Sequence, residues 1–546
     1  MDGKLVFNIK DYGAVGDGKT LETKAIQDAI EACTQAGGGT VYVPPGEYMS
    51  HTIYLKDNVF LNLDQGATLM PDPEGHECYV NGFVRANNVN NIGITGKGRL
   101  YGYGPRYWLS WEIKSNEYLK AQGAIPADEQ PQVFGDDRGP HEQFWPKWWF
   151  MRKPYPHLNS FVNWPGHFIT LFGCENVWLE DILIDRQPHT AIFPSKCKNM
   201  FIRGVRIENT NWRGPNTDGI SIDRCQDVVI SDCTIFTGDD GIVIKGYDFE
   251  IPPHDPDREI TRNITVTNCL INSKCNAFKI GTETCGDFEN ITFSNSVIHS
   301  PTDEPFMKSG IALTCVDGAE VRNITISNIV MKKARTPIFI RLGSRQEYCR
   351  KEVGKLYDVK IHNVVAYDAL HTSFITAIPG HYLENISISD VRIITKGGQQ
   401  ASAAALPVPE NEKEYPDSTT HGELISAYGL YCRHVKNLKI DGFEVDCDRP
   451  DGRYLAVFDD VHDLVVDGLG ANNVTGENPV AVLTNVNSAY VKGSRAPNGT
   501  GTFVKVEGGQ SKDITVMGNV FTKAKTGVEV AADVPAGEGY TAGNRE

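Results

Sequence analysis

The sequence has no apolar run near the roughly 20 residues that a membrane-spanning helix requires. It also lacks an excess of basic residues, because 53 Lys and Arg stand against 69 Asp and Glu, a net charge of −16. Such a chain has no broad basic face to neutralise phosphates, so we exclude nucleic acid and membranes as partners. The same charge creates no general field that attracts an anionic polysaccharide, so an acidic substrate would need basic groups placed locally.

Two sequence signals are also missing. The N-terminus lacks a basic stretch followed by an apolar core, so we do not interpret it as a signal peptide. We expect a cytoplasmic protein if the chain is complete, and a secreted or periplasmic one if it is a mature form. No C-x-x-C pair with zinc-site spacing occurs, so we expect no metal and no cofactor. The 13 cysteines are odd in number and scattered, which favours buried thiols over a disulfide framework.

An internal repeat is the strongest positive signal. A polar residue, then Asn or Asp, then alternating apolar positions recur at separations of 23 to 36 residues, with one separation of 52 between Asn385 and Asn437. Clear copies begin at Glu175, Lys198, Gln226, Arg262, Glu289, Arg322, Tyr357, Glu384, Lys436 and His462. The period of two predicts strands. A repeat of about 25 residues without a helix is typical of one coil of a solenoid, and parallel connections are right-handed. The predicted fold is therefore all-β, a right-handed parallel β-helix.

The repeat also revises the number of domains. Length alone suggests three or four domains at about 150 residues each, but the repeat predicts one β-helix domain over residues 1–546. Residues 23–36 carry apolar side chains at helical spacing and end at three glycines, which predicts an amphipathic helix that caps the first coil. Two stretches without the repeat, 108–150 and 397–422, are predicted to be long loop insertions on one face.

The first insertion is rich in aromatic residues. It holds five of the eight tryptophans, which are Trp108, Trp111, Trp145, Trp148 and Trp149. These rings could stack on sugars and close a cleft into a pocket, which would favour an exo-acting enzyme. They could equally form a satellite core that holds the loop down. Both interpretations stay open.

Three aspartates are expected to meet at one corner of the solenoid. Asp218 lies in Asn-Thr-Asp-Gly, and Asp239 and Asp240 lie in Gly-Asp-Asp-Gly, about one coil further on. Residues one coil apart stack at strand spacing, about 4.8 Å. Carboxylates this close cannot all ionise freely, so at least one should have a raised pKa, as glycosidic cleavage requires. The alternative is that these residues serve only as turn formers.

Residues 12–18 (Y-G-A-V-G-D-G) and 43–46 (V-P-P-G) resemble the start of pectin-lyase-like β-helix proteins. The N-T-D and G-D-D motifs, followed by I-V-I-K, resemble glycoside hydrolase family 28, the polygalacturonase family, in a divergent bacterial branch. The resemblance implies inversion by single displacement. Asp239 would protonate the leaving oxygen, and Asp218 and Asp240 would activate water. Acid and base should then lie about 6.5–9.5 Å apart.

The sequence departs from that family where G-H-G and R-I-K are expected. Asn276 stands where the family has its histidine, and the Arg and Lys that grip the galacturonate carboxylate are missing. Lys245, Lys279 and Arg341 are candidates to replace these cations, although the lysines could instead form ion pairs with Asp240 and Glu283. His189, about one coil before Asp218, could line the cleft or serve as a turn residue. The predicted substrate-binding residues are Asn216, His189, Lys245, Asn276, Lys279, Glu283 and Arg341.

These features predict an inverting glycosidase that acts on pectin-derived or related α-linked oligosaccharides, and we expect it to be exo-acting. Two alternatives remain. One is a polysaccharide lyase or epimerase, with Lys279 as base and the aspartates holding Ca²⁺. The other is a non-catalytic glycan-binding β-helix. The expected partner is an oligosaccharide or polysaccharide.

Overall fold

Parallel pairing between strands one coil apart organises the whole structure. The computed structural model describes residues 5–73, 82–128, 154, 157, 165–209, 214–247, 260–300, 307–345, 349, 352–537 and 539–546. They form two compact units, residues 1–244 with 263–275 and residues 245–262 with 276–546. Each unit is built from coils of a right-handed parallel β-helix, which confirms the predicted fold class. The single domain over 1–546 stays a prediction.

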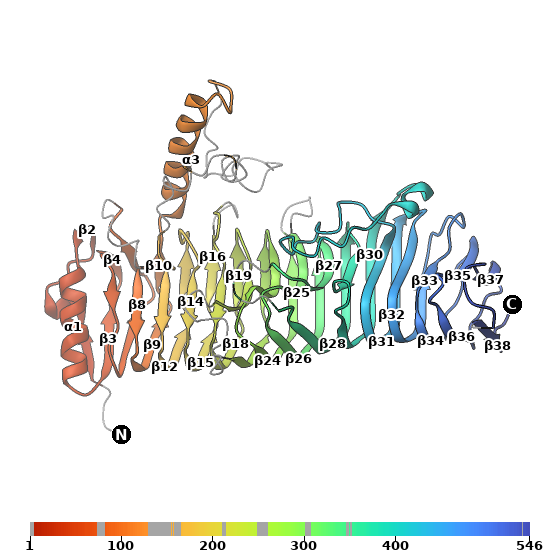
Figure 1. Ribbon diagram of the computed structural model, residues 1–546. Helices are drawn as coiled ribbons and strands as arrows, with labels where there is room; N and C mark the ends of the chain where they lie inside the picture. The colour runs from red at the N-terminus through yellow and green to blue at the C-terminus, as the bar shows by residue number, and fades with distance from the viewer. Residues whose placement is uncertain are drawn as a thin grey trace. The chain divides into compact units, whose positions relative to one another are not determined.

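The first unit contains both described α-helices and the shorter strands (Figure 1). Its elements are β1 (Val6–Asn8), η1 (Ile9–Tyr12), β2 (Asp17–Leu21), α1 (Thr23–Gln35), β3 (Gly39–Val43), β4 (Gly46–Ser50), β5 (Ile53–Tyr54), β6 (Val59–Leu63), β7 (Ala67–Pro71), β8 (Val84–Asn87), β9 (Asn90–Gly96), β10 (Arg99–Tyr101), α3 (Gly104–Ala121), β11 (Ile169–Phe172), β12 (Glu175–Glu180), β13 (Leu183–Asp185), β14 (Ile192–Ser195), β15 (Lys198–Arg203), β16 (Arg206–Glu208), β17 (Ile220–Asp223), β18 (Gln226–Ser231), β19 (Thr234–Thr237) and β22 (Leu270–Ser273). Two strands, β20 (Ile242–Gly246) and β21 (Thr261–Thr267), contain residues of both units.

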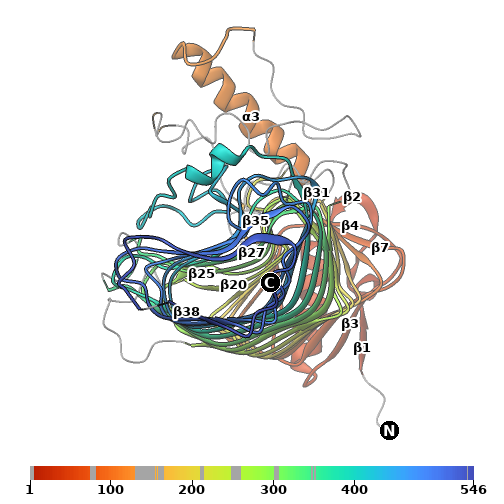
Figure 2. The same cartoon turned by 90° about the vertical axis from the view of Figure 1, so that its right-hand side faces the viewer.

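The second unit has longer strands, and successive coils lie behind one another in Figure 2. Its elements are β23 (Asn276–Thr284), β24 (Phe288–His299), β25 (Met307–Cys315), β26 (Glu320–Lys332), β27 (Ala334–Leu342), β28 (Lys355–Ala369), β29 (Ser373–Thr376), β30 (Leu383–Gly397), η4 (Ala401–Ala405), β31 (Ala427–Arg449), β32 (Tyr454–Ala471), β33 (Ala481–Thr484), β34 (Asn487–Lys492), β35 (Thr500–Glu507), β36 (Lys512–Met517), β37 (Ala524–Val530) and β38 (Gly539–Ala542).

Helix α1 covers the first coil, as its apolar spacing predicted. It lies beside β3 at the N-terminal end of the first unit (Figure 1). The buried side chains are those at the predicted helical spacing, namely Ala25, Ile26, Ala29, Ile30 and Cys33. Gly38 follows with φ +115°, and a Cβ there would lie 2.7 Å from the carbonyl oxygen of Asn58, so only glycine fits this exit from the helix.

Asparagines at the corners of the coils connect one coil to the next. Asn176 and Asn199, in the repeated phrase, adopt left-handed backbone angles with φ of 57° and 54°, which Asn tolerates better than most residues. Each side-chain amide donates to the equivalent position of the preceding coil, as in Asn199 to Asn176 at 3.3 Å. The bond from Asn437 to Asn385, at 2.7 Å, is equivalent. The repeated Asn therefore fixes the corner and satisfies its own amide.

The first insertion begins with a helix that the sequence analysis did not predict. Helix α3 rises from the end of β10 (Figure 1). Trp108 and Trp111 on this helix are buried, and the Trp108 indole donates to the Pro188 carbonyl at 3.0 Å. Their burial favours the satellite core, which was one of the two interpretations. The other three tryptophans, Trp145, Trp148 and Trp149, lie outside the described residues.

The second insertion, predicted at 397–422, leaves the coils after β30 and returns at β31. Short turns and η4 replace strands there (cyan in Figure 2). The Ser344 amide donates to the Glu412 carbonyl at 2.9 Å, and Lys308 forms an ion pair with Asp417. These contacts attach the insertion to the coils between β25 and β28.

One histidine in this region links stability to pH. His434 Nδ1 lies 2.6 Å from Asp460 Oδ2, and its Nε2 lies 3.4 Å from Glu410 Oε1 in the insertion. Burial by itself lowers the pKa of His434, but the carboxylates of Glu410 and Asp460 outweigh it and raise this pKa above its usual value.

The protonated form of His434 stabilises the fold, so we expect its contribution to the free energy of unfolding to be fully present below about pH 6.5 and to be lost as the pH rises through the raised pKa of His434. Urea unfolding between pH 5.5 and 9 measures this. The loss of free energy of unfolding that His434 causes as the pH rises should be absent from His434→Gln. His362→Gln, on β28, is the control. An identical pH dependence in all three proteins would contradict this role for His434.

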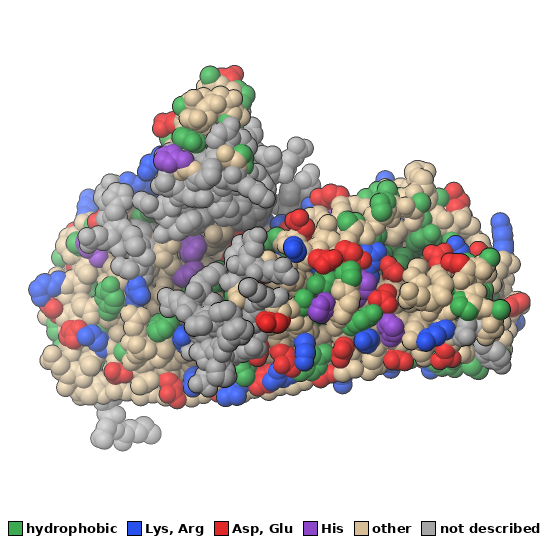
Figure 3. Space-filling view, viewed as in Figure 1, with side chains coloured by type: hydrophobic (Ala, Val, Ile, Leu, Met, Phe, Trp, Pro, Cys, Tyr) green, Lys and Arg blue, Asp and Glu red, His purple; other side chains and the backbone are tan. Residues whose placement is uncertain are grey.

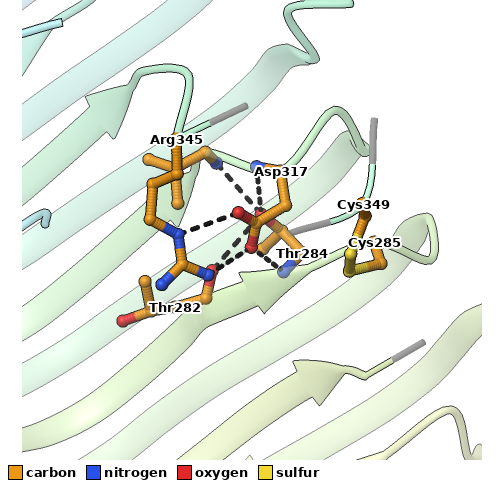
Figure 4. Close-up of a disulfide and its surroundings, with 7 residues drawn as sticks. Thr282, Thr284, Cys285, Asp317, Arg345 and Cys349 are labelled. Atoms are coloured by element: carbon orange, nitrogen blue, oxygen red, sulfur yellow. Dashed lines mark hydrogen bonds and ion pairs between the residues drawn. A yellow bond between two sulfur atoms is a disulfide. The ribbon is translucent and has the colours of Figure 1, made fainter. Parts of the chain in front are cut away.

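The cysteines only partly follow the prediction of buried thiols. Ten are free and buried: Cys33, Cys174, Cys197, Cys225, Cys233, Cys269, Cys275, Cys315, Cys432 and Cys447. Cys285 and Cys349, however, form a disulfide across 64 residues (Figure 4). The sequence favoured buried thiols over a disulfide framework and did not reveal this pair, because coils far apart in the sequence bring together cysteines whose spacing carries no signal.

The disulfide lies beside a buried ion pair in the second unit (Figure 4). The Arg345 guanidinium donates through Nε and Nη2 to both carboxylate oxygens of Asp317, at 2.8 and 2.5 Å. Asp317 also accepts the backbone N–H of Thr284 at 3.0 Å. This bidentate geometry gives the pair a fixed orientation.

The described surface carries charges of both signs. Among the residues that the structure describes, no helix is long and apolar enough to cross a membrane. The face in Figure 3 shows acidic and basic side chains interspersed rather than gathered into one basic area. The face shown has no broad basic area, which agrees with the prediction from the composition that no general electrostatic field attracts an anionic polysaccharide.

Candidate active site

Two sharp turns of the first unit hold the predicted aspartates. Asp218 ends the N-T-D motif just before β17, and Asp239 and Asp240 lie between β19 and β20. The Gly219 amide donates to the Asp240 carbonyl at 2.9 Å. Thr217 Oγ1 accepts the Gly238 amide at 3.2 Å, so the two motifs contact each other directly. The N-T-D and G-D-D motifs therefore lie against each other in neighbouring coils, as their spacing predicted.

The three carboxyl groups are buried, with 5, 8 and 3% of Asp218, Asp239 and Asp240 exposed. A carboxylate oxygen of Asp239, one of Asp240 and Cys275 Sγ lie within 4.8 Å of one another. Asp239 Oδ1 accepts the Asp240 amide at 2.9 Å, and Asp218 Oδ2 accepts the Ser221 hydroxyl at 2.8 Å. Asp239 and Asp240 thus converge, which requires the backbone bend expected at this motif.

Glycines make this bend possible by allowing close approach of the backbone. A Cβ at Gly238 would lie 2.6 Å from the Gly214 carbonyl oxygen, and one at Gly219 would lie 2.5 Å from the Gly241 carbonyl oxygen. Real Cβ atoms do not approach this closely, so both positions require glycine. The glycines of the motifs therefore position the aspartates.

Two hydroxyl groups that the sequence analysis missed stabilise the bend through hydrogen bonds to its backbone. Thr237 Oγ1 donates to the Asp239 carbonyl at 2.7 Å, and Ser273 Oγ donates to the same oxygen at 2.6 Å. Both residues are buried. Cys275, whose thiol lies beside the two carboxylates, was also missed. Position one coil beyond G-D-D was the only available signal for Ser273 and Cys275.

A metal ion could contact this group too, because the described side chains of Asp239, Asp240 and Cys275 each offer one ligand atom at close range. Two carboxylates and a thiol suit a divalent cation such as zinc. The same pair of close carboxylates suits acid–base chemistry equally well. We assign no metal to it, because no other feature of the described residues indicates one.

Two predicted binding residues of the first unit lie at turns. Asn216 has φ of 53°, so its place in the N-T-D motif also meets a conformational need. The His189 ring stacks on His167 with centroids 4.5 Å apart, and His167 stacks on Phe193 at 3.8 Å. A substrate contact for either residue stays a prediction.

The second unit brings three predicted residues together. Lys245 Nζ lies 3.7 Å from Glu283 Oε2, and buried Lys279 lies 5.9 Å from the centre of the Tyr415 ring, in the second insertion. Burial by itself raises the pKa of Glu283, but Lys245, Lys279 and Arg345 outweigh it and hold this pKa below its usual value. The ion pair to Glu283, one of the two alternatives for Lys245, is therefore present.

Asn276 and Arg341 have other partners than this ion pair. Asn276 begins β23, is buried, and pairs with Ser309 of β25. The Arg341 guanidinium is buried and donates through Nη1 to the Ala377 carbonyl at 2.9 Å. Through Nη2 it donates to the carbonyls of Glu410 and Asn411 at 2.7 and 3.2 Å.

These bonds change our interpretation of Arg341. Both of its terminal nitrogens bind backbone carbonyls, two of them in the second insertion, and burial lowers its pKa to about 10. A guanidinium engaged in this way anchors a loop. The position of Arg341 therefore favours a structural role over the predicted substrate contact.

A pair of carboxyl groups is the catalytic equipment that most glycoside hydrolases share, so the turns that hold Asp239 and Asp240 suit a glycosidase. The model of glycosyl hydrolases family 28 matches residues 147–411, and a model described as rhamnogalacturonase A/epimerase, pectate lyase-like, matches residues 6–99. The chain is similar to glycosyl hydrolase family 28, as its motifs indicated, and it is a glycosidase.

Known proteins similar to this chain point the same way. An exo-poly-alpha-D-galacturonosidase of Dickeya chrysanthemi is 24% identical over 470 residues, which cover 80% of this chain and 74% of that protein. A hyperthermoactive exopolygalacturonase from Thermotoga maritima has a TM-score of 0.56 at 22% identity, covering 80% of this chain and 92% of the other. A family 28 exopolygalacturonase of Yersinia enterocolitica has a TM-score of 0.61 at 19% identity, covering 89% and 78%. The two structures share the fold.

Proposed function

We propose that this glycosidase releases galacturonate-type residues from the ends of pectin-derived oligosaccharides, with inversion at the anomeric carbon. The buried, convergent pair Asp239 and Asp240, held against the N-T-D turn, is the observation that carries the proposal. The similarity to an exo-poly-alpha-D-galacturonosidase over 80% of the chain supports the substrate class and the exo mode.

The carboxylates divide the work as follows. Asp239 gives its proton to the glycosidic oxygen as the bond to the anomeric carbon breaks. Asp218 and Asp240 hold a water molecule on the opposite face of the sugar and take its proton as the oxygen attacks. Oxygens of Asp239 and Asp240 lie within 4.8 Å, closer than the about 6.5–9.5 Å between the carboxyl groups of inverting enzymes, so this pair alone leaves little room for water. Asp239 and Asp240 thus do not provide the separation expected of acid and base, and the proposal assigns that separation to Asp239 and Asp218.

A lyase or epimerase is the weaker alternative. The rhamnogalacturonase/epimerase-like model matches only residues 6–99, which precede all three aspartates. Lys279, the candidate base for elimination, belongs to a cluster with Glu283 and Tyr415. A carboxylate pair fits hydrolysis without a further base.

The stereochemistry of the first product tests the proposal. Proton NMR during cleavage of trigalacturonic acid should show the β-anomer first, because inversion of an α-linkage produces it. An end-labelled oligomer should shorten by one sugar at a time. An α-anomer formed first would exclude single displacement, and an unsaturated product absorbing in the ultraviolet would exclude hydrolysis.

A further inference from the structure

A groove of about 460 Å³ lies in the second unit, where successive coils turn into β26, β28 and β30. Its volume falls within the roughly 300–1,000 Å³ of small-molecule sites. It shares no residue with the aspartate turns. Gly354 lines it and can only be glycine, because a Cβ there would lie 2.3 Å from the Ala319 carbonyl oxygen.

Two half-buried tyrosines form the aromatic part of the groove. The Tyr357 hydroxyl donates to a carboxylate oxygen of Glu320. The Tyr382 hydroxyl donates to Asp460 Oδ2 at 3.0 Å. Each ring is thus fixed at its polar end, so that it presents apolar area at little cost in conformational entropy.

Polar groups of both kinds surround these rings. In register across three strands, Tyr357 lies opposite Glu384, and Glu384 lies opposite Lys436. Lys436 Nζ lies 4.0 Å from the centre of the Tyr382 ring. Sugar hydroxyls both donate and accept hydrogen bonds, so they match a wall of carboxylates and ammonium groups.

The charges of the lining residues indicate which kind of sugar fits. Three carboxylates, Glu320, Asp358 and Glu384, line the groove, against the two lysines Lys355 and Lys436. Lys355 lies opposite Glu320 in the paired strands, so this cation has a carboxylate beside it. A polyuronate would bring more negative charge to a wall that already carries an excess of it. A neutral sugar would not.

We propose that this groove is a second glycan-binding site, which takes neutral hexose or pentose residues of a mixed polysaccharide. Tyr357 provides the ring on which a sugar face stacks. Glu384, Lys436 and the Asn385–Asp358 pair, joined by a 2.8 Å hydrogen bond, contact its hydroxyls. Binding to this groove does not depend on the hydrolytic function.

Calorimetry on the full-length Asp239→Asn protein tests the site with α-1,5-arabinotetraose, β-1,4-galactotetraose and trigalacturonic acid. At least one neutral tetrasaccharide should bind saturably. Tyr357→Ala should weaken this binding about five- to tenfold, the range expected for one lost ring contact. Tyr357→Phe, which keeps the ring, should retain most of the affinity. Tyr367→Ala, which removes a 43% exposed tyrosine of the same strand, should leave it unchanged.

Three results would overturn the site: neither neutral tetrasaccharide binds, the two alanine variants bind alike, or Tyr357→Ala weakens only trigalacturonic acid. Lys436→Ala, which removes one exposed head group, repeats the test if Tyr357→Ala unfolds. In the otherwise wild-type protein, Tyr357→Ala should cleave trigalacturonic acid at the normal rate. The binding data and the cleavage data therefore fail independently of each other.

Discussion

Replacing Asp239 by Asn is expected to lower kcat on a galacturonide substrate by at least about 10³-fold, because an amide cannot protonate the leaving oxygen and general acid catalysis contributes about 10²–10⁴-fold. The fold should survive, since the Asn side-chain oxygen can still accept the Asp240 amide that Asp239 Oδ1 accepts at 2.9 Å. Initial rates of reducing-end release and the midpoint of thermal unfolding measure the two effects separately.

The matched control for this change is Asp227→Asn. Asp227 lies at an exposed corner position and accepts the Asn263 side chain at 2.7 Å, a bond that an Asn oxygen can also accept. We expect normal activity and stability from it. Full activity in Asp239→Asn would refute the assignment of the general acid. Lost activity together with an early unfolding transition would show damage to the fold instead.

Replacing Arg341 by Leu is expected to cost about 3 kcal/mol or more of the free energy of unfolding. The buried guanidinium donates to the carbonyls of Ala377, Glu410 and Asn411, and a hydrogen bond to a charged group contributes about 1.5–3 kcal/mol. Without Arg341 these acceptors lose their donor and the second insertion loses its anchor. Urea unfolding gives the stability, and limited proteolysis reports cleavage within 397–422.

Arg392→Leu is the control for Arg341. Arg392 binds the carboxylate of Asp446 at 2.6 Å, but its side chain is 55% exposed. Exposed ion pairs contribute at most about 1 kcal/mol to the free energy of unfolding. Unchanged stability in Arg341→Leu with a raised KM would contradict the anchoring role and restore the substrate contact that the sequence predicted.

Local patterns made most of the fold predictable. The helical spacing in 23–36 matches α1, whose structure spans Thr23–Gln35. The alternation after each corner Asn matches the strands, because a period of two along the chain is a property of one strand alone. Helix α3 was not predicted, since its Trp and Tyr residues suggested a loop built around aromatic side chains.

The site was predictable as far as one coil spacing reaches. Asp218, Asp239 and Asp240 could be expected at one corner because their separation equals a coil. The hydroxyls of Thr237 and Ser273 could not be assigned, since their shared acceptor depends on how three coils stack. The contacts of Arg341 could not be assigned for a similar reason. Its charge is visible in the sequence, but its carbonyl partners lie up to 70 residues away.

Each corner asparagine donates its side-chain amide to the preceding coil, and this direction determines which hydrogen bond deamidation would break. Deamidation converts an exposed Asn into a carboxylate, which still accepts a hydrogen bond but can no longer donate one. At Asn385 it would therefore break the 2.8 Å bond to Asp358 in the preceding coil and spare the 2.7 Å bond from Asn437 in the next. Asp358 already holds a carboxylate at such a position, where it accepts a hydrogen bond from the Asn385 side chain. Deamidation at one corner thus removes the link to the preceding coil and leaves the link from the next coil intact.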